Sequence, residues 1–235
     1  MELNGDAVIR MPHKLTPDSV AELRRSIELV CAGPSPVAVL IGADDEIFCT
    51  GLAIDDEGPI ETRPFCELLT LLSDAPKPTL AFVDGKSIGG GFGMACACDW
   101  MIATERATFG LPELLWGLIP AMIWPAIVGR LGANVARRWT ISAHTRSAQE
   151  ALDAGVLDEL VEAHNGPHRV RRAVRMLTRL EPGATQQLRR WHREAQTTPL
   201  VEALARGAVL TQEMAASLVA RERVGAFARG ESPWN

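Results

Sequence analysis

Three consecutive glycines, Gly89 to Gly91, lie where an expected strand gives way to an expected helix. The first backbone N–H groups of a helix have no acceptor within the helix, and the helix dipole adds about half a positive charge at that end. Glycines let a ligand come close to these groups because they have no side chain. The stretch is therefore suited to stabilising negative charge on a bound molecule.

Three kinds of anion site use a turn of this sort. A P-loop is excluded because its lysine follows the glycines, whereas Lys86 precedes them here. A dinucleotide-binding fingerprint requires the spacing G-x-G-x-x-G, which the segment GGGFG lacks, and no suitable acid follows on a next strand. An oxyanion hole for a thioester enolate fits better, with one N–H group supplied by the glycine triplet.

An oxyanion hole needs a second N–H group from another loop. The turn FCTGLAI, residues 48–54, follows a buried strand and is the candidate donor. Taken singly, each turn is equally compatible with tight packing or with a simple connection. A third segment, FGLPELLWGLIP at residues 109–120, occurs further along the chain. The presence of all three segments in one sequence is poorly explained by chance.

These turns are positioned by an alternation of strands and helices over the first two thirds of the chain. Apolar β-branched runs predict strands, and capping residues bound the helices. Strands are expected at 7–10, 37–42, 47–54, 78–85, 100–104 and 107–110, with helices at 16–33, 60–75 and from the triplet to about residue 97. Beyond residue 112 the pattern is mostly helical, with a return segment near 155–161. The alternation predicts an α/β fold with parallel strand pairing.

The composition restricts the classes of protein that need to be considered. The chain has 235 residues, of which 47% are hydrophobic and 23% charged, as expected for one globular domain. A net charge of -5 argues against a protein that binds nucleic acid irrespective of sequence. There is no tyrosine, so a phenol cannot serve as the acid.

The cysteines and the apolar runs predict a cytoplasmic protein. Five cysteines, an odd number without a secretory signal, suggest reduced thiols. No His/Cys cluster has zinc spacing, so we expect no metal site. No apolar run is long enough to span a bilayer, so we expect no membrane partner.

Four segments resemble the crotonase (enoyl-CoA hydratase/isomerase) superfamily, and they occur in the family's order. They are AVLIGADDEIFCTGLAI (38–54), PTLAFVDGKSIGGGFGMACACDWMIAT (78–104), ATFGLPELLWGLIP (107–120) and SAQEALDAGVLDELV (147–161). The resemblance implies a crotonase-like spiral of ββα units. It further implies that residues 1–165 form a thioester-binding core and that residues 166–235 form a helical trimerisation region of the same structural domain. A homotrimer or hexamer is the implied assembly.

The resemblance also implies catalytic residues. The two oxyanion-hole amides correspond to Leu52 and Gly90, and one of the family's two glutamates corresponds to Glu113. The other glutamate lies three residues after the middle glycine, where this chain has Gly93. One carboxylate can still transfer one proton, or several in sequence. The alternative for Glu113 is a helix N-terminal glutamate favoured by the dipole after Pro112.

Further residues are expected to contact the substrate: Gly51, Gly89, Gly91, Lys86 and Trp116. Lys86 would bind a distal carboxylate, the pantetheine or a phosphate, or it is a surface charge.

Three groups of charged residues likewise have two possible interpretations, one as part of a binding or catalytic site and one as solvent-exposed charges. Asp55 and Asp56 would replace the acid of the family's first loop or lie in solvent. Arg137, Arg138 and the arginines of 169–175 would face an acidic carrier protein or CoA phosphates, or form solvated helix faces.

Within the superfamily, the segments DGKSIGGG, LPELLWGLIPAMIWP and GESPWN resemble the dehydratases of polyketide β-branching cassettes. Those enzymes dehydrate 3-hydroxy-3-methylglutaryl groups carried on an acyl carrier protein. The resemblance implies a lyase that uses no cofactor beyond the phosphopantetheine of the carrier or of CoA. Two alternatives stay open. One is a decarboxylase or another enolate-forming member that acts on acyl-CoA or acyl-carrier protein; the other is a non-catalytic paralogue that binds the carrier or acts as a scaffold.

Overall fold

The computed structural model describes residues 7–53 and 62–232. Its strands are β1 (Ala7–Arg10), β2 (Ala38–Ile41), β3 (Ile47–Cys49), β4 (Thr79–Val83), β5 (Lys86–Ile88), β6 (Trp100–Thr104), β7 (Thr108–Gly110), β8 (Arg146–Ser147) and β9 (Glu159–Val161). Its α-helices are α1 (Pro17–Ala32), α2 (Thr62–Ser73), α3 (Gly90–Cys96), α4 (Trp124–Leu131), α5 (Ala133–Ser142), α6 (Ala148–Asp153), α7 (Gly166–Leu177), α8 (Pro182–Ala195), α9 (Leu200–Ala216) and α10 (Leu218–Ala228). Two short 3-10 helices, η1 (Glu113–Trp116) and η2 (Ala163–Asn165), complete the described elements.

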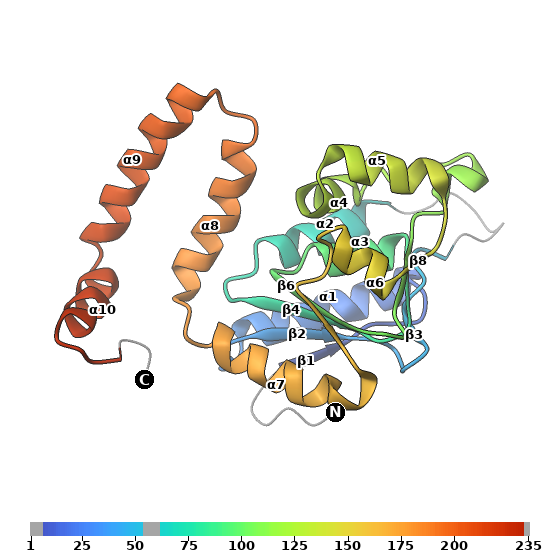
Figure 1. The fold of residues 1–235 in the computed structure, drawn as a ribbon, viewed down its shortest axis with the longest axis horizontal. Helices are drawn as coiled ribbons and strands as arrows, with labels where there is room; N and C mark the ends of the chain where they lie inside the picture. The colour runs from blue at the N-terminus through green and yellow to red at the C-terminus, as the bar shows by residue number, and fades with distance from the viewer. Residues whose placement is uncertain (1–6, 54–61, 233–235) are drawn as a thin grey trace.

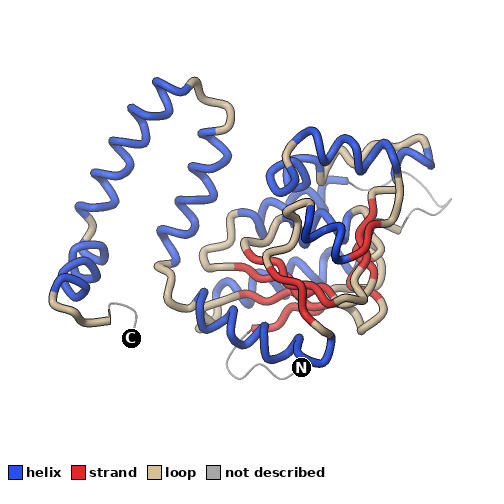
Figure 2. The backbone as a smooth tube through the Cα atoms, in the orientation of Figure 1, coloured by secondary structure: helices blue, strands red, loops and turns tan. Residues whose placement is uncertain are grey.

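The strands form two sheets that share a repeating unit. The larger sheet has the order β1-β2-β4-β6-β9, and its strands in the described residues pair in parallel; the smaller has the order β3-β5-β7-β8. In each of the units β2–β3–α2 and β4–β5–α3, the first strand joins the larger sheet and the second joins the smaller one. This is the predicted α/β spiral of ββα units, and Figure 2 shows the strands in red between the helices.

Local signals account for most of the element ends. Thr16 caps α1 in a capping box with Ser19, and Pro17 occupies the first helical position, as expected. The expected strands and helices are present, most of them with ends that differ by one or two residues; of the segment 47–54, expected as a short strand and a turn around Gly51, the strand ends at Cys49. Two short strands, β5 and β8, were not predicted, because three residues and two residues respectively carry too little periodicity.

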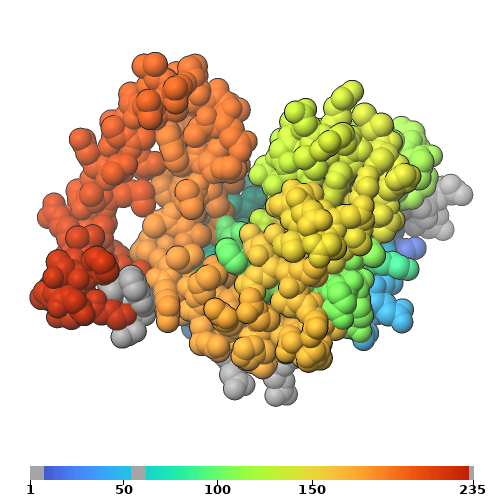
Figure 3. Space-filling view, viewed as in Figure 1, coloured from blue at the N-terminus to red at the C-terminus, as the bar shows by residue number. Residues whose placement is uncertain are grey.

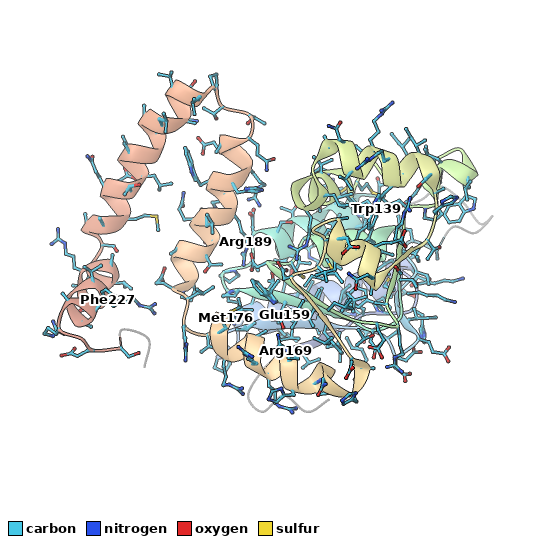
Figure 4. All side chains as sticks on the ribbon, in the orientation of Figure 1. Trp139, Glu159, Arg169, Met176, Arg189 and Phe227 are labelled. Atoms are coloured by element: carbon cyan, nitrogen blue, oxygen red, sulfur yellow. The ribbon has the colours of Figure 1, made fainter. Side chains whose placement is uncertain are left out.

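Helices cover both faces of the larger sheet. One face packs with α1 and α2 into the main hydrophobic core. The other face carries apolar side chains of β2, β4 and β6, which pack against α7. An ion pair from Arg169 of α7 to Glu159 of β9 fixes that helix to the sheet, and both residues are labelled in Figure 4.

Helices α8, α9 and α10 form an arm beside this core, drawn from orange to red in Figure 1 and seen as a separate lobe in Figure 3. None of the side chains of these three helices is fully buried. Arg189 of α8 attaches the arm by donating hydrogen bonds to both carboxylate oxygens of Asp99 and to the carbonyls of Ala75 and Lys77. Phe227, labelled in Figure 4, is 68% exposed on α10.

Candidate active site

The two predicted turns lie against each other. β3 and β5 pair in parallel, so the turns that follow them emerge on the same side of the smaller sheet. Gly51 and Gly89 have positive φ angles of 87° and 51°, which favour glycine. A Cβ placed on Gly51 would lie only 2.9 Å from the backbone nitrogen of Gly90. The sharp turns therefore bring the backbone of residues 51–52 next to the start of α3.

The backbone amides of Leu52 and Gly90 are free to bind a ligand. The carbonyl of Gly51 accepts from Leu15 at 2.8 Å, and the N–H of Ala53 donates to Leu15 at 2.9 Å. Because successive N–H groups of an extended chain alternate in direction, the Leu52 N–H points away from Leu15. Gly90 begins α3, where N–H groups lack a helical acceptor. Neither amide has a hydrogen-bond acceptor among the described residues.

Glu113 is brought to these amides by β7. The N–H of Gly89 donates to the carbonyl of Gly110 at 2.9 Å, which ties the triplet to the end of that strand. Glu113 follows three residues later, and its Oε1 lies 3.0 Å from the position that a Cβ on Gly89 would take. Its Oε2 is buried and has no hydrogen-bond partner in the described part of the chain. Burial raises the pKa of the Glu113 carboxyl above its usual 4.5, as suits a group that both takes and returns a proton.

These groups line a cavity of about 250 Å³. Its walls are mostly apolar, and the described residues that form them are Thr50, Gly51, Leu52, Thr62, Phe65, Ile88, Gly89, Gly90, Pro112, Glu113, Trp116, Leu118, Ile119, Pro120, Ala121, Met122 and Ile123. Six of the eight predicted site residues are among them. Trp116 is at the rim, where it is 59% exposed.

Two of the predicted substrate-binding residues, Lys86 and Gly91, are not among the described residues of the cavity wall. Lys86 is exposed at the start of β5, where its backbone N–H donates to Glu46. A Cβ on Gly91 would lie 2.2 Å from the carbonyl oxygen of Cys49, so this glycine lets α3 pack on β3. The three glycines thus have different roles: Gly89 forms the turn, Gly90 offers a backbone N–H group, and Gly91 allows the close packing.

Gly93, where hydratases of the family carry a glutamate, is packed against a residue that the sequence did not single out. A Cβ on Gly93 would lie 2.2 Å from Cγ2 and 2.5 Å from Cβ of Ile123. Ile123 is 3% exposed and lines the cavity. The space beside Gly93 is therefore filled by an aliphatic side chain, which no local pattern indicates.

The remaining candidates lie elsewhere. Asp55 and Asp56 are outside the described residues. Arg137 and Arg138 are exposed on α5. Burial raises the pKa of the Cys49 thiol to about 11, so it serves as a small apolar group rather than as a nucleophile.

Two kinds of feature are absent from the described residues. No group of three or more His, Cys, Asp and Glu side chains there is arranged to hold a metal ion. No helix there has the length and apolar character needed to cross a membrane.

The enoyl-CoA hydratase/isomerase family model matches residues 9–235 of this chain. The chain belongs to the enoyl-CoA hydratase/isomerase family. This confirms the superfamily predicted from the four sequence segments, and the turns, the amides and Glu113 lie within the matched range.

Individual members of the family are similar to this chain at moderate identity. A peroxisomal bifunctional enzyme of Danio rerio is 33% identical over 60% of the chain and 20% of its own length. The bacillaene synthase dehydratase PksH of Bacillus subtilis is 31% identical over 54% of the chain and 53% of its own length. An enoyl-CoA hydratase from Shewanella pealeana superimposes with a TM-score of 0.85, covers 97% of this chain and 92% of its own, and is 22% identical, which establishes the fold. The chain spans only about a fifth and about half of the lengths of the two curated relatives.

Proposed function

We propose that this protein is a lyase that removes water from a 3-hydroxyacyl thioester by way of an enolate. One observation supports the proposal above all. Two backbone amides, at Leu52 and Gly90, have no acceptor among the described residues, one carboxyl oxygen of Glu113 has no partner there, and all three groups adjoin the same largely apolar cavity. Donors of this kind stabilise an oxyanion as it forms, and removing one typically costs about 3–4 kcal/mol in the transition state.

The proposed reaction needs a single carboxylate. Glu113 takes a proton from C2 of the acyl group, and the electrons of that C–H bond form the enolate, whose oxygen accepts hydrogen bonds from Leu52 and Gly90. The enolate then collapses to the C2–C3 double bond as the C3–O bond breaks. Glu113 gives the same proton to the leaving hydroxyl, so one water is released and the carboxylate is regenerated. The raised pKa of Glu113 makes its carboxylate a stronger base for the first of these transfers.

The proposed substrate is a 3-hydroxy-3-methylglutaryl group on an acyl carrier protein. The match to the bacillaene synthase dehydratase supports this choice. The acyl group enters on the phosphopantetheine of the carrier, or on CoA, and no other cofactor is required. The protein acts in the cytoplasm.

We further propose that the arm assembles a homotrimer or hexamer. Apolar side chains on α9 and α10 are open to solvent, with Val201 82% exposed and Leu218 72% exposed. Large exposed apolar surfaces of this kind mark sites of association with another molecule. Arg189 anchors α8 to the core, and α9 and α10 lie on the far side of α8 from the sheets (Figure 1).

Decarboxylation of the dehydrated acyl group is the second candidate. Loss of CO₂ generates the enolate without a base, and the replacement of a second carboxylate by Gly93 and Ile123 favours such a reaction. Glu113 would then only protonate or orient the product.

Mass spectrometry of the acyl carrier protein distinguishes these candidates. Incubating 3-hydroxy-3-methylglutaryl-carrier protein with the enzyme should give loss of one water from the acyl group, and Glu113→Gln should abolish it. Release of CO₂ from the 3-methylglutaconyl form, without dehydration, would replace the lyase by a decarboxylase. Binding without turnover of either form would instead identify a non-catalytic carrier-binding protein.

A further inference from the structure

Ile123 occupies a fixed position in the cavity wall. It precedes the first residue of α4 and accepts a hydrogen bond on its carbonyl from Ile127 at 3.0 Å, so its backbone is held by the first turn of that helix. Helices α3 and α4 pack together (Figure 1). Because Gly93 has no side chain, Ile123 comes so close to α3 that no Cβ fits between them.

The contact lies close to the expected reaction centre. Gly93 follows Gly90 by three residues, less than one helical turn. If the thioester oxygen accepts from the Gly90 amide, C3 of the acyl group lies two bonds beyond the carbonyl carbon, alongside the first turn of α3. Glu113 and the aliphatic side chain of Ile123 both line this cavity.

We propose that Ile123 is a specificity-determining residue that selects acyl thioesters carrying an apolar branch at C3. This inference rests on the proposed function, since it requires the cavity to bind an acyl thioester. An aliphatic wall cannot hydrogen-bond a hydroxyl or hold a water molecule, but it gains dispersion contacts and apolar burial from a methyl group. At a branched C3 the alkyl branch therefore faces Ile123, and the hydroxyl faces Glu113.

The test compares two CoA thioesters that differ by one methyl at C3, crotonyl-CoA and 3-methylcrotonyl-CoA, by isothermal titration calorimetry. The wild-type protein should bind the branched thioester about tenfold more tightly, the lower end of the range for one methyl group in an apolar pocket. Ile123→Val removes one methylene from the wall and should reduce that ratio about fourfold. Ile127→Val is the matched control, because Ile127 is also buried, one turn further along in α4, but is not among the described residues of the cavity wall.

The outcomes distinguish the role of Ile123 from the proposed function on which that role rests. An equal preference in wild type, or a ratio that Ile123→Val leaves unchanged while both thioesters bind, would overturn the role of Ile123. Failure of the wild type to bind either acyl group, on CoA and on an acyl carrier protein alike, would overturn the proposed function and the inference with it. Melting temperatures of both valine variants show that they are folded, and Ile123→Leu, which moves the branch without changing volume, should also lower the ratio.

Discussion

Replacing Gly93 by alanine tests the most unusual contact of the site. The new Cβ would lie 2.2 Å from Cγ2 of Ile123, whereas apolar carbon atoms pack best at about 3.5–4.0 Å. A change of rotamer cannot remove the clash, because Cβ of Ile123 itself would be 2.5 Å away. The start of α4 must therefore move, and the packing between α3 and α4 must loosen.

The expected loss follows from two opposing terms. Overpacking a buried site costs about 3 kcal/mol at the upper end of its usual range. Alanine in place of glycine inside a helix returns about 1 kcal/mol. The net loss of about 2 kcal/mol should lower the melting temperature of a chain of this size by about 4–8 °C. Differential scanning calorimetry measures this shift.

Gly129→Ala provides the matched control. Gly129 lies within α4, and a Cβ there would meet nothing within 4 Å, so only the gain in helix propensity remains. That variant should melt about 2–4 °C above the wild type. In an Ile123→Gly background, Gly93→Ala should cost less than it does in the wild type, since the two residues share one contact. A Gly93→Ala protein that melts with or above the wild type would refute the reasoning.

Three further predictions concern Glu113 and the arm. Glu113→Gln should lower turnover of the 3-hydroxyacyl thioester at least about 100-fold in steady-state assays while its affinity stays within a few fold, because only proton transfer is lost; equal losses of affinity would contradict this. The raised pKa of Glu113 means that the folded state binds this proton more tightly than the unfolded state, so the wild type loses stability as the pH rises from 4.5 through the raised pKa. Urea unfolding at several pH values should therefore show that the free energy of unfolding of Glu113→Gln rises relative to that of the wild type across that window and differs from it by a constant amount above the window. If the difference in unfolding free energy between the two proteins is the same at every pH, burial is not the cause. Arg189→Met removes the partner of the mostly buried Asp99 and should cost about 3 kcal/mol, whereas Arg193→Met, which breaks a half-exposed pair, should cost less than about 1 kcal/mol by the same measurement.

Much of the fold was predictable because its signals are local. Capping residues and β-branched runs bound α1, β2 and β4 within one or two residues of their observed ends. The same holds for the two donor turns, since a glycine with positive φ at residue 51 or 89 is a backbone requirement that appears directly in the sequence. Strand β5 was not predicted, because its three residues, between a turn and a glycine triplet, are too few to show the alternating pattern of a strand.

The individual roles of the predicted site residues depended on packing. Lys86 and Gly91 flank the donor in sequence, yet one is exposed at a strand start and the other packs against Cys49. Sequence adjacency places residues on the same turn, but it does not determine which of them face the cavity. Glu113 Oε2 has no hydrogen-bond partner among the described residues, and this is likewise a consequence of how the loop after β7 is buried.

The sequence alone determined the family, the two turns and Glu113, because each can be recognised from a short segment whose backbone conformation depends on neighbouring residues. The resemblance also implies that Gly93 stands where hydratases of the family carry a glutamate. Only the tertiary structure decided what occupies that place, since Ile123 lies 30 positions further along the chain and meets Gly93 through the packing of α4 on α3. No local pattern encodes such a contact, because side-chain packing between distant segments is set by the assembled core.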